Sequence, residues 1–333
     1  MIKDLKLKTS GTAKGTFIVS DIELKPFKTK PGNFLSCEFQ DRSGILKGIM
    51  WDGADTCKTW IKNNMVVDVT GTMATYNDAP QFIISTMVKC TIFDTSLLTP
   101  SLELQKIDEI MSRLDEFRLK ITNETCKTVW QAVIGTPVKK QFVDGIEIPS
   151  DSFREQFSKC PGGKGEVHHA YCGGLAQHSE SMVTIAENVA DKFGLDKDIL
   201  MTGCLIHDLG KIESYQWTPV IDLTDEGRLL HHTTLGYKML LDMTYSGLHR
   251  VTPDTTFLKL AHIIISHHDE EGIRKPMFPE AVAVALIDSM DAATIHARDF
   301  SRKPENKEAD SNWTKFCQLT GRQYFCPETI RQY

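Results

Sequence analysis

The spacing of hydrophobic residues changes once along this chain of 333 residues, near Pro100. Before that point, apolar residues alternate in short runs separated by turn residues, which is typical of β-strands. After it, they recur about every 3.6 residues, which is typical of amphipathic helices. A chain of this length is also long for one core and comfortable for two. We therefore expect two domains.

The first pattern predicts five strands with a helical insert between the third and the fourth. The strands are expected at residues 16–19, 34–39, 45–51, 66–73 and 81–85, and the insert at 52–64. This is the strand plan of an OB-fold barrel. We predict an N-terminal all-β OB-fold barrel over residues 1–94.

The second pattern predicts an all-α domain. Helices are expected at residues 102–114, 125–133, 152–157, 177–193, 199–207, 229–243, 257–268 and 279–298. We divide this half into a helical linker region at 95–150, a main helical domain at 151–300, and a C-terminal extension at 301–333 that packs on that domain.

Composition narrows the class of protein. No run approaches eighteen apolar residues and the N-terminus has no apolar signal core, so we expect a cytoplasmic chain that does not bind membranes. The nine cysteines form no Cys-x-x-Cys pair and are expected to be reduced thiols. Residues 1–93 hold 12 Lys and Arg against 9 Asp and Glu, so this part is weakly basic, whereas the remainder holds 26 against 35 and is acidic.

The histidines are confined to one part of the chain. All eleven lie between His168 and His296, which places any metal or acid–base chemistry in the helical half. His207 and Asp208 follow an apolar helix, and Gly210 lets the chain leave helical geometry there. His178 lies on the inner face of another amphipathic helix.

Two further pairs lie at apolar positions. His267 and His268 end an apolar helix, and Asp288 and Asp291 share the apolar face of the last long helix. A buried carboxylate is unfavourable unless it is paired or binds a metal. A single buried histidine is more often a hydrogen-bonded core residue, but one binuclear metal centre would satisfy all of these groups at once.

These residues resemble a known family. His178, His207-Asp208 and Asp288 are similar, in order, to the H…HD…D signature of the HD-domain metal-dependent phosphohydrolases. His232, His267 and His268 resemble the additional ligands of two-metal members. Segments 168–178, 207–211, 266–268 and 287–292 are similar to the YhaM-type 3′-to-5′ exoribonucleases, which also carry an N-terminal OB domain.

The resemblance implies a two-metal site. Its expected ligands are His178, His207, Asp208, His232, His267, His268 and Asp288, and whether Asp291 or either of His267 and His268 ligates directly stays open. Mn²⁺ or Co²⁺ is favoured, with Fe²⁺, Zn²⁺ or Mg²⁺ as alternatives. Two cations bridged by Asp208 and a water would generate hydroxide and hold the phosphoryl oxygens.

Further catalytic candidates lie close to the expected ligands. Besides Asp208 they are Lys211, which could neutralise a phosphate, and His168 and His169, which could contact the scissile phosphate or the leaving group. Each also has a structural alternative: Lys211 as a helix-end lysine, and the two histidines as packing residues at the entrance to the His178 helix.

The barrel is expected to bind the substrate. Phe27 and Tyr76 are the best candidates for exposed rings that stack on bases, and Lys25, Lys28 and Lys30 crowd the first hairpin loop. The predicted function is a metal-dependent 3′-to-5′ exonuclease acting on single-stranded RNA or DNA, with RNA favoured, in a chain that could form a homo-oligomer.

Two alternatives stay open. One is an HD nucleotidase or cyclic-nucleotide phosphodiesterase that acts on small nucleotides and has a regulatory barrel. The other is a non-catalytic protein that binds single strands.

Overall fold

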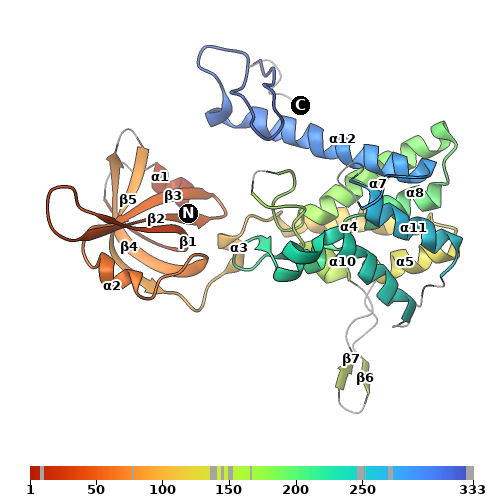
Figure 1. Cartoon of the computed structure of the whole chain (residues 1–333), viewed down its shortest axis with the longest axis horizontal. Helices are drawn as coiled ribbons and strands as arrows, with labels where there is room; N and C mark the ends of the chain where they lie inside the picture. The colour runs from red at the N-terminus through yellow and green to blue at the C-terminus, as the bar shows by residue number, and fades with distance from the viewer. Residues whose placement is uncertain are drawn as a thin grey trace. The chain divides into compact units, whose positions relative to one another are not determined.

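The chain forms two units (Figure 1). This computed structural model describes residues 1–7, 11–76, 79–135, 141–143, 146–148, 153–165, 167–245, 251, 253–268 and 273–327. The first unit comprises Met1–Glu103 together with Tyr215–Thr224, and the second comprises Leu104–Ser214 together with Asp225–Tyr333. Parts of the expected linker region and extension, at 136–140 and 328–333, lie outside the described residues.

The first unit is a closed five-stranded barrel with the strand order β1-β2-β3-β5-β4. All neighbouring strands are antiparallel except β3 and β5, whose parallel pairing completes the barrel. Helix α2 (Ala54–Lys58) lies between the third and fourth strands, where the insert was expected. The predicted OB-like barrel is therefore confirmed. Its strands are β1 (Thr12–Pro26), β2 (Asn33–Asp41), β3 (Gly44–Met50), β4 (Met65–Tyr76) and β5 (Ala79–Lys89), and α1 (Ile2–Lys6) precedes them.

The barrel interior is filled by alternate side chains of the strands. Phe39 of β2 and Phe82 of β5 are fully buried and contact each other edge to face, with ring centroids 6.1 Å apart. Both rings belong to the core and are not available to a ligand. The two-residue alternation that predicted the strands follows from this division into inward and outward side chains.

A short segment from the helical half of the sequence belongs to the barrel unit. Strands β8 (Tyr215–Gln216) and β9 (Asp222–Leu223) pair with each other within it. The hydroxyl of Thr99, which follows α3 (Thr95–Leu98), donates a hydrogen bond to the carbonyl of Pro219 over 2.6 Å. Val220 packs against the buried cluster that contains Leu98. Ten residues between two helices of the second unit thus complete the first unit.

The second unit is built from helices, as predicted. To these the structure adds one short antiparallel pair, β6 (Gln141–Val143) and β7 (Ile146–Ile148), which the hydrophobic spacing did not indicate. The helices are α4 (Leu104–Arg118), α5 (Glu124–Ile134), α6 (Arg154–Lys159), α7 (Gly174–Phe193), α8 (Lys197–Ile206), α9 (Lys211–Ser214), α10 (Asp225–Tyr245), α11 (Thr255–Ser266), α12 (Pro279–Arg302) and the 3₁₀ turn η2 (Pro304–Asn306).

Side-chain caps set where several of these helices begin. Asn123, Asp196 and Asp254 accept hydrogen bonds from backbone N–H groups in the first turns of α5, α8 and α11. Such caps satisfy donors that a helix cannot satisfy itself. The cap at Asp196 fixes the start of α8, and therefore fixes where its C-terminal end presents His207 and Asp208.

One close backbone approach orders the region after α8. A Cβ atom on Gly210 would lie 1.9 Å from the carbonyl oxygen of His232 and 2.3 Å from the amide nitrogen of Gly236. Only glycine allows this contact. It holds the turn before α9 directly against α10, so that residues from both segments can face a common point.

The segment after α12 packs against the end of that helix. His296 Nε2 lies 3.2 Å from the Cys317 sulfur, and the Phe300 ring contacts Tyr324 with centroids 6.0 Å apart. Cys317 is buried, and all nine cysteines are free thiols. Among the described helices, none combines the length and apolar character that crossing a bilayer requires.

Candidate metal centre

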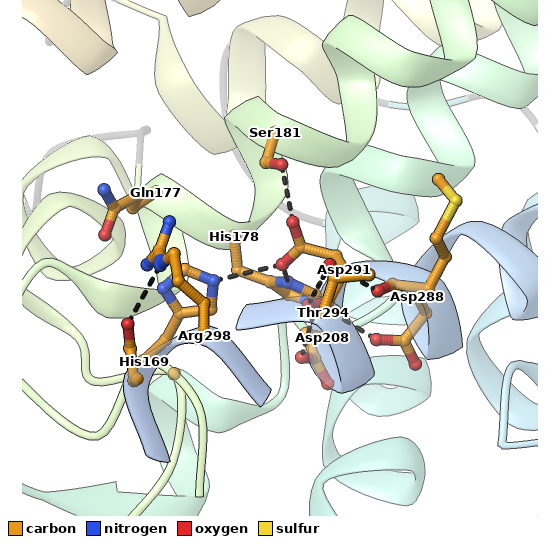
Figure 2. A network of polar contacts seen from close by, with 12 residues as sticks. His169, Gln177, His178, Ser181, Asp208, Asp288, Asp291, Thr294 and Arg298 are labelled. Carbon is orange, nitrogen blue, oxygen red and sulfur yellow. Dashed lines mark hydrogen bonds and ion pairs between the residues drawn. The ribbon is translucent and has the colours of Figure 1, made fainter. Parts of the chain in front are cut away.

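Seven histidine and aspartate side chains from five helical segments converge in the second unit. His178 projects from the first turns of α7, His207 caps α8, and Asp208 follows it. Asp288 lies on α12, where Figure 2 shows it beside His178 and Asp208. The other members are His232 on α10 and His267 and His268 directly after α11. The structure thus brings together all seven residues that were expected to bind metal.

The first group of ligand atoms surrounds His178. Its Nε2 lies 3.2 Å from His207 Nε2, 3.2 Å from Asp288 Oδ1 and 3.8 Å from Asp208 Oδ2. His207 Nε2 is 3.3 Å from the same Asp208 oxygen. Two imidazole nitrogens and two carboxylates therefore face one small space.

The second group surrounds the other oxygen of Asp208. Its Oδ1 lies 3.2 Å from His232 Nε2 and 3.7 Å from His267 Nε2. His268 Nε2 is 2.9 Å from His232 Nε2, and one ligand atom from each of these four residues lies within 4.8 Å of the others. Asp208 is thus shared, with one oxygen directed to each group.

Backbone carbonyls set the tautomers of two histidines. His207 Nδ1 lies 3.0 Å from the carbonyl of Cys204, and His267 Nδ1 lies 2.9 Å from the carbonyl of Ile264. A carbonyl can only accept, so both Nδ1 atoms carry the proton. Each Nε2 is therefore the nitrogen directed toward the carboxylates and the one available to a metal, which is the arrangement found in metal-binding histidines.

The residues present fit divalent cations. Asp208 Oδ1 and His267 Nε2 are buried and have no hydrogen-bond partner. Buried polar atoms are nearly always hydrogen-bonded, and a cation bound between these two acceptor atoms would satisfy both of them. Mixed imidazole and carboxylate ligands suit first-row divalent metals.

Burial and neighbouring charges keep three of these seven residues in the protonation state that binds a metal. Burial lowers the pKa of His232 to about 4 and that of His267 well below its ordinary value. Burial alone would raise the pKa of Asp208, but the Lys211 ammonium and the His207 ring hold it well below its ordinary value. At neutral pH these imidazoles are neutral and this carboxylate is ionised.

His178 differs from the other imidazoles. Burial lowers its pKa, but the hydrogen bonds to Asp288 and Asp291 outweigh burial and raise the pKa to about 9. In the metal-free protein the ring therefore carries two protons at neutral pH. A cation that binds at Nε2 must displace one of them.

A network behind His178 fixes the ring in place. Asp291 Oδ2 lies 2.8 Å from His178 Nδ1 and 3.0 Å from His169 Nε2, while Asp291 Oδ1 accepts a 2.6 Å hydrogen bond from Ser181 (Figure 2). Asp291 is buried and contacts the ring edge opposite Nε2. It therefore orients the candidate ligand His178 through Nδ1, a role that its position three residues after Asp288 did not reveal.

The expected catalytic residues adjoin the ligands. Lys211 Nζ lies 2.6 Å from Asp208 Oδ2 and donates a 2.6 Å hydrogen bond to the carbonyl of Gly162. The ring of His168 lies 5.5 Å from that of His178, centroid to centroid, and burial is the main cause that lowers the pKa of His168 to about 4. His169 is buried, with Nδ1 3.0 Å from the Tyr171 hydroxyl and Nε2 against Asp291.

The barrel unit gathers part of the expected nucleic-acid interface. Phe27 packs with Phe34 and Trp51 at centroid distances of 5.6 and 6.1 Å, and Lys30 Nζ lies 4.2 Å from the centre of the Phe27 ring. Trp51 is 41% exposed. We name Phe27, Phe34 and Trp51 the barrel aromatic cluster. Trp51 was not among the residues predicted for this interface, although its place at the end of an expected strand was a signal.

The other barrel candidates lie outside this cluster. Lys25 lies in β1 and not in the hairpin loop as expected, and it forms a 2.6 Å ion pair with Glu23. Lys28 is exposed in the loop between β1 and β2. Tyr76 is 65% exposed at the end of β4.

Known proteins are similar to the helical half and to most of the chain. Residues 175–293 match the family model described as "HD domain". The chain is 26% identical over 301 residues to "3′-5′ exoribonuclease YhaM" of Bacillus velezensis, covering 89% of this chain and 90% of that protein. It is 25% identical to the protein of the same name in Bacillus subtilis, over 88% of each chain, and 25% identical to that of Listeria monocytogenes serotype 4b, over 85% and 86%. The resemblance seen in the sequence is confirmed, and an HD domain implies that divalent metal is bound.

The protonation of His178 predicts that metal binding depends on pH. Because the raised pKa of about 9 leaves a displaceable proton on the ring, affinity for Mn²⁺ should rise with pH by up to about tenfold per unit between pH 6.5 and 8.5. Isothermal titration in buffers of different ionisation enthalpy should show close to one proton released per cation at pH 7. Affinity that is independent of pH across this range would contradict the assignment.

The network behind His178 predicts an effect of Asp291 on metal affinity. Asp291→Asn should weaken Mn²⁺ binding by about 10- to 100-fold, because outer carboxylates that orient a ligand histidine contribute that much. The matched control is Ser181→Ala, which removes the other partner of Asp291 and keeps its bond to His178. Equal affinities in Asp291→Asn and the unmodified protein would show that Asp291 does not position the ligand.

Proposed function

We propose that this chain, an HD-domain protein of the YhaM type, is a metal-dependent 3′-to-5′ exoribonuclease that releases 5′-nucleotides from single-stranded RNA. The observation that carries the proposal is the convergence of seven ligand residues around the shared carboxylate of Asp208. Similarity to the exoribonucleases extends over 89% of the chain and so includes the barrel as well as the helical unit.

The proposed cofactor is a pair of divalent cations, with Mn²⁺ or Co²⁺ favoured. His178, His207, Asp208 and Asp288 would hold one, and Asp208, His232, His267 and His268 the other. Such cations supply a nucleophilic water near neutral pH and neutralise charge on the phosphoryl oxygens.

The bond changes define what the surrounding residues must do. The oxygen of the attacking water bonds to phosphorus, the bond from phosphorus to the 3′ oxygen of the preceding ribose breaks, and that oxygen takes up a proton. The released nucleotide keeps its 5′ phosphate. The chain must therefore hold the phosphate at the metal centre and accommodate the terminal nucleoside beside it.

Three residues are proposed to assist. Lys211 keeps Asp208 ionised through its 2.6 Å contact and adds positive charge where the phosphate would bind. His168 is neutral at neutral pH, so its ring N–H can donate a hydrogen bond to a phosphoryl oxygen. Both ring nitrogens of His169 already have partners, so we assign it a positioning role through Asp291.

The barrel is proposed to hold the single strand. Bases would stack on the barrel aromatic cluster, and Lys28 and Lys30 would contact phosphates. Lys25 would contribute less because it is paired with Glu23. The choice of RNA over DNA, a cytoplasmic location and a homo-oligomeric state stay predictions.

One observation favours a second candidate, a phosphohydrolase that acts on small nucleotides. The chain after residue 93 carries nine more acidic than basic residues, which would disfavour a long polyanion. Bound cations would offset that negative charge at the metal centre. A non-catalytic strand-binding protein is disfavoured because the complete set of ligand residues is present and converges.

The proposal predicts that hydrolysis depends on Asp208. With Mn²⁺ and a 5′-labelled RNA oligonucleotide, the unmodified protein should give a descending ladder, and Asp208→Ala should reduce the rate by roughly a thousandfold or more. The control Asp242→Ala changes an exposed aspartate that pairs with Lys238, and it should leave the rate unchanged. Hydrolysis of mononucleotides without a ladder would favour the second candidate, and undiminished turnover in Asp208→Ala would exclude the metal mechanism.

The proposed path of the strand predicts a dependence on substrate length. Changing Lys25, Lys28 and Lys30 together to Ala should raise KM for a 20-nucleotide RNA by roughly tenfold at low salt, because contacts to phosphates are lost. KM for a dinucleotide should stay the same. The matched control changes Lys3, Lys6 and Lys62, which are exposed elsewhere on the same unit. Equal effects on long and short substrates would argue against a strand held by this loop.

A further inference from the structure

A small cavity adjoins the metal centre beside His168. Its volume is about 180 Å³, and it lies between the loop that carries His168 and the C-terminal end of α12. We name it the His168 pocket, and its lining includes His168, Tyr171, His296, Asp299, Phe300 and Lys303. All of them belong to the second unit.

The pocket and the metal centre share a wall. One ring nitrogen of His168 lies within 4.8 Å of ligand atoms of both His178 and Asp288. His169, which also lines the cavity, contacts Asp291 over 3.0 Å. A ligand whose phosphate lies at the metal centre would therefore have this cavity directly beside that phosphate.

Two rings of α12, His296 and Phe300, line the pocket. His296 and Phe300 are stacked, with centroids 5.9 Å apart and planes inclined by 26°. Phe300 also contacts Tyr324, with centroids 6.0 Å apart. Flat rings of this kind are the surfaces on which proteins stack unpaired bases.

Residues after α12 hold these rings in position. Cys317 lies 3.2 Å from His296 Nε2, and the side-chain amide of Asn306 donates a 3.0 Å hydrogen bond to the carbonyl of Phe300. The ring wall is thus fixed before a ligand arrives, which reduces the conformational entropy that binding would remove.

The volume limits what can enter. Pockets for drug-sized ligands measure roughly 300 to 1,000 Å³. A cavity of about 180 Å³ is suited to one ring system. Lys303 is exposed at the cavity, where a cation suits the polar edge of a base or the hydroxyls of a ribose.

We propose that the His168 pocket binds the base of the 3′-terminal nucleotide, with its 5′ phosphate at the metal centre. This inference rests on the proposed function, and it adds the position of the released nucleotide. The ligand class is a nucleoside 5′-monophosphate, which is both the end of the substrate and the product.

The first test uses the unmodified protein with Mn²⁺. Binding of 5′-AMP and of ribose 5-phosphate is measured by equilibrium titration. Both carry the phosphate, but only 5′-AMP carries a base, so 5′-AMP should bind at least about tenfold more tightly. Equal affinities would overturn the proposal without any variant.

The second test removes the stacking ring. Phe300→Leu keeps an apolar side chain against Tyr324 and should weaken 5′-AMP binding by about tenfold, with ribose 5-phosphate binding unchanged. The matched control is Phe316→Leu, a ring of the segment after α12 that is 54% exposed and does not line the cavity. If the Phe300→Leu variant keeps the full preference for 5′-AMP over ribose 5-phosphate, the proposal is overturned.

The two proposals fail in different ways. A descending RNA ladder together with equal binding of 5′-AMP and ribose 5-phosphate would leave the exoribonuclease standing and remove the base pocket. A preference for 5′-AMP that depends on Phe300, together with no hydrolysis of RNA, would support the pocket and remove the exoribonuclease.

Discussion

The carboxylate of Asp208 lies where two groups of imidazoles meet, and the arrangement of the helical unit follows from that position. A buried carboxylate is unfavourable unless charges or donors compensate it. Here Lys211 contacts one oxygen, while the other faces His232 and His267 without a hydrogen bond. Five helices, two of them at their C-terminal ends, must bring residues to one point to build this environment. The close approach at Gly210, which leaves no space for a Cβ, is what brings the Asp208 turn against α10.

The sequence predicts the candidate metal ligands better than it predicts the groups that orient them. Asp288 could be found because a carboxylate on an apolar helix face needs a partner, and His207 because it ends an apolar helix. The proton positions could not be found, since they depend on carbonyls such as that of Ile264, which any residue would provide. Asp291 lies on the same apolar helix face as Asp288, so the sequence does not distinguish them. The structure does: Asp288 contacts His178 Nε2 and faces the metal centre, whereas Asp291 contacts Nδ1 on the other side of the ring.

The barrel was predictable because its five strands alternate clearly, but one part of its unit was not. Strands β8 and β9 have two residues each, too few for a period of two to be visible. They join the unit through long-range contacts such as that of Thr99 with Pro219. This segment follows α9, which begins at Lys211, and precedes α10, which carries His232. A cut after residue 103 would therefore remove part of the barrel unit itself.

An enzyme that removes nucleotides from one end must distinguish an end from the interior of a strand. In an interior nucleotide the 3′ oxygen continues into another phosphate, and the next base needs a place of its own. The His168 pocket holds about 180 Å³, room for one ring system, and residues after α12 fix its wall. If the terminal base occupies it, a strand that continued beyond that base would need space that this cavity does not provide. Recognition of the end would then come from the limited volume next to the cluster, and the barrel would contribute affinity for the strand without selecting its terminus.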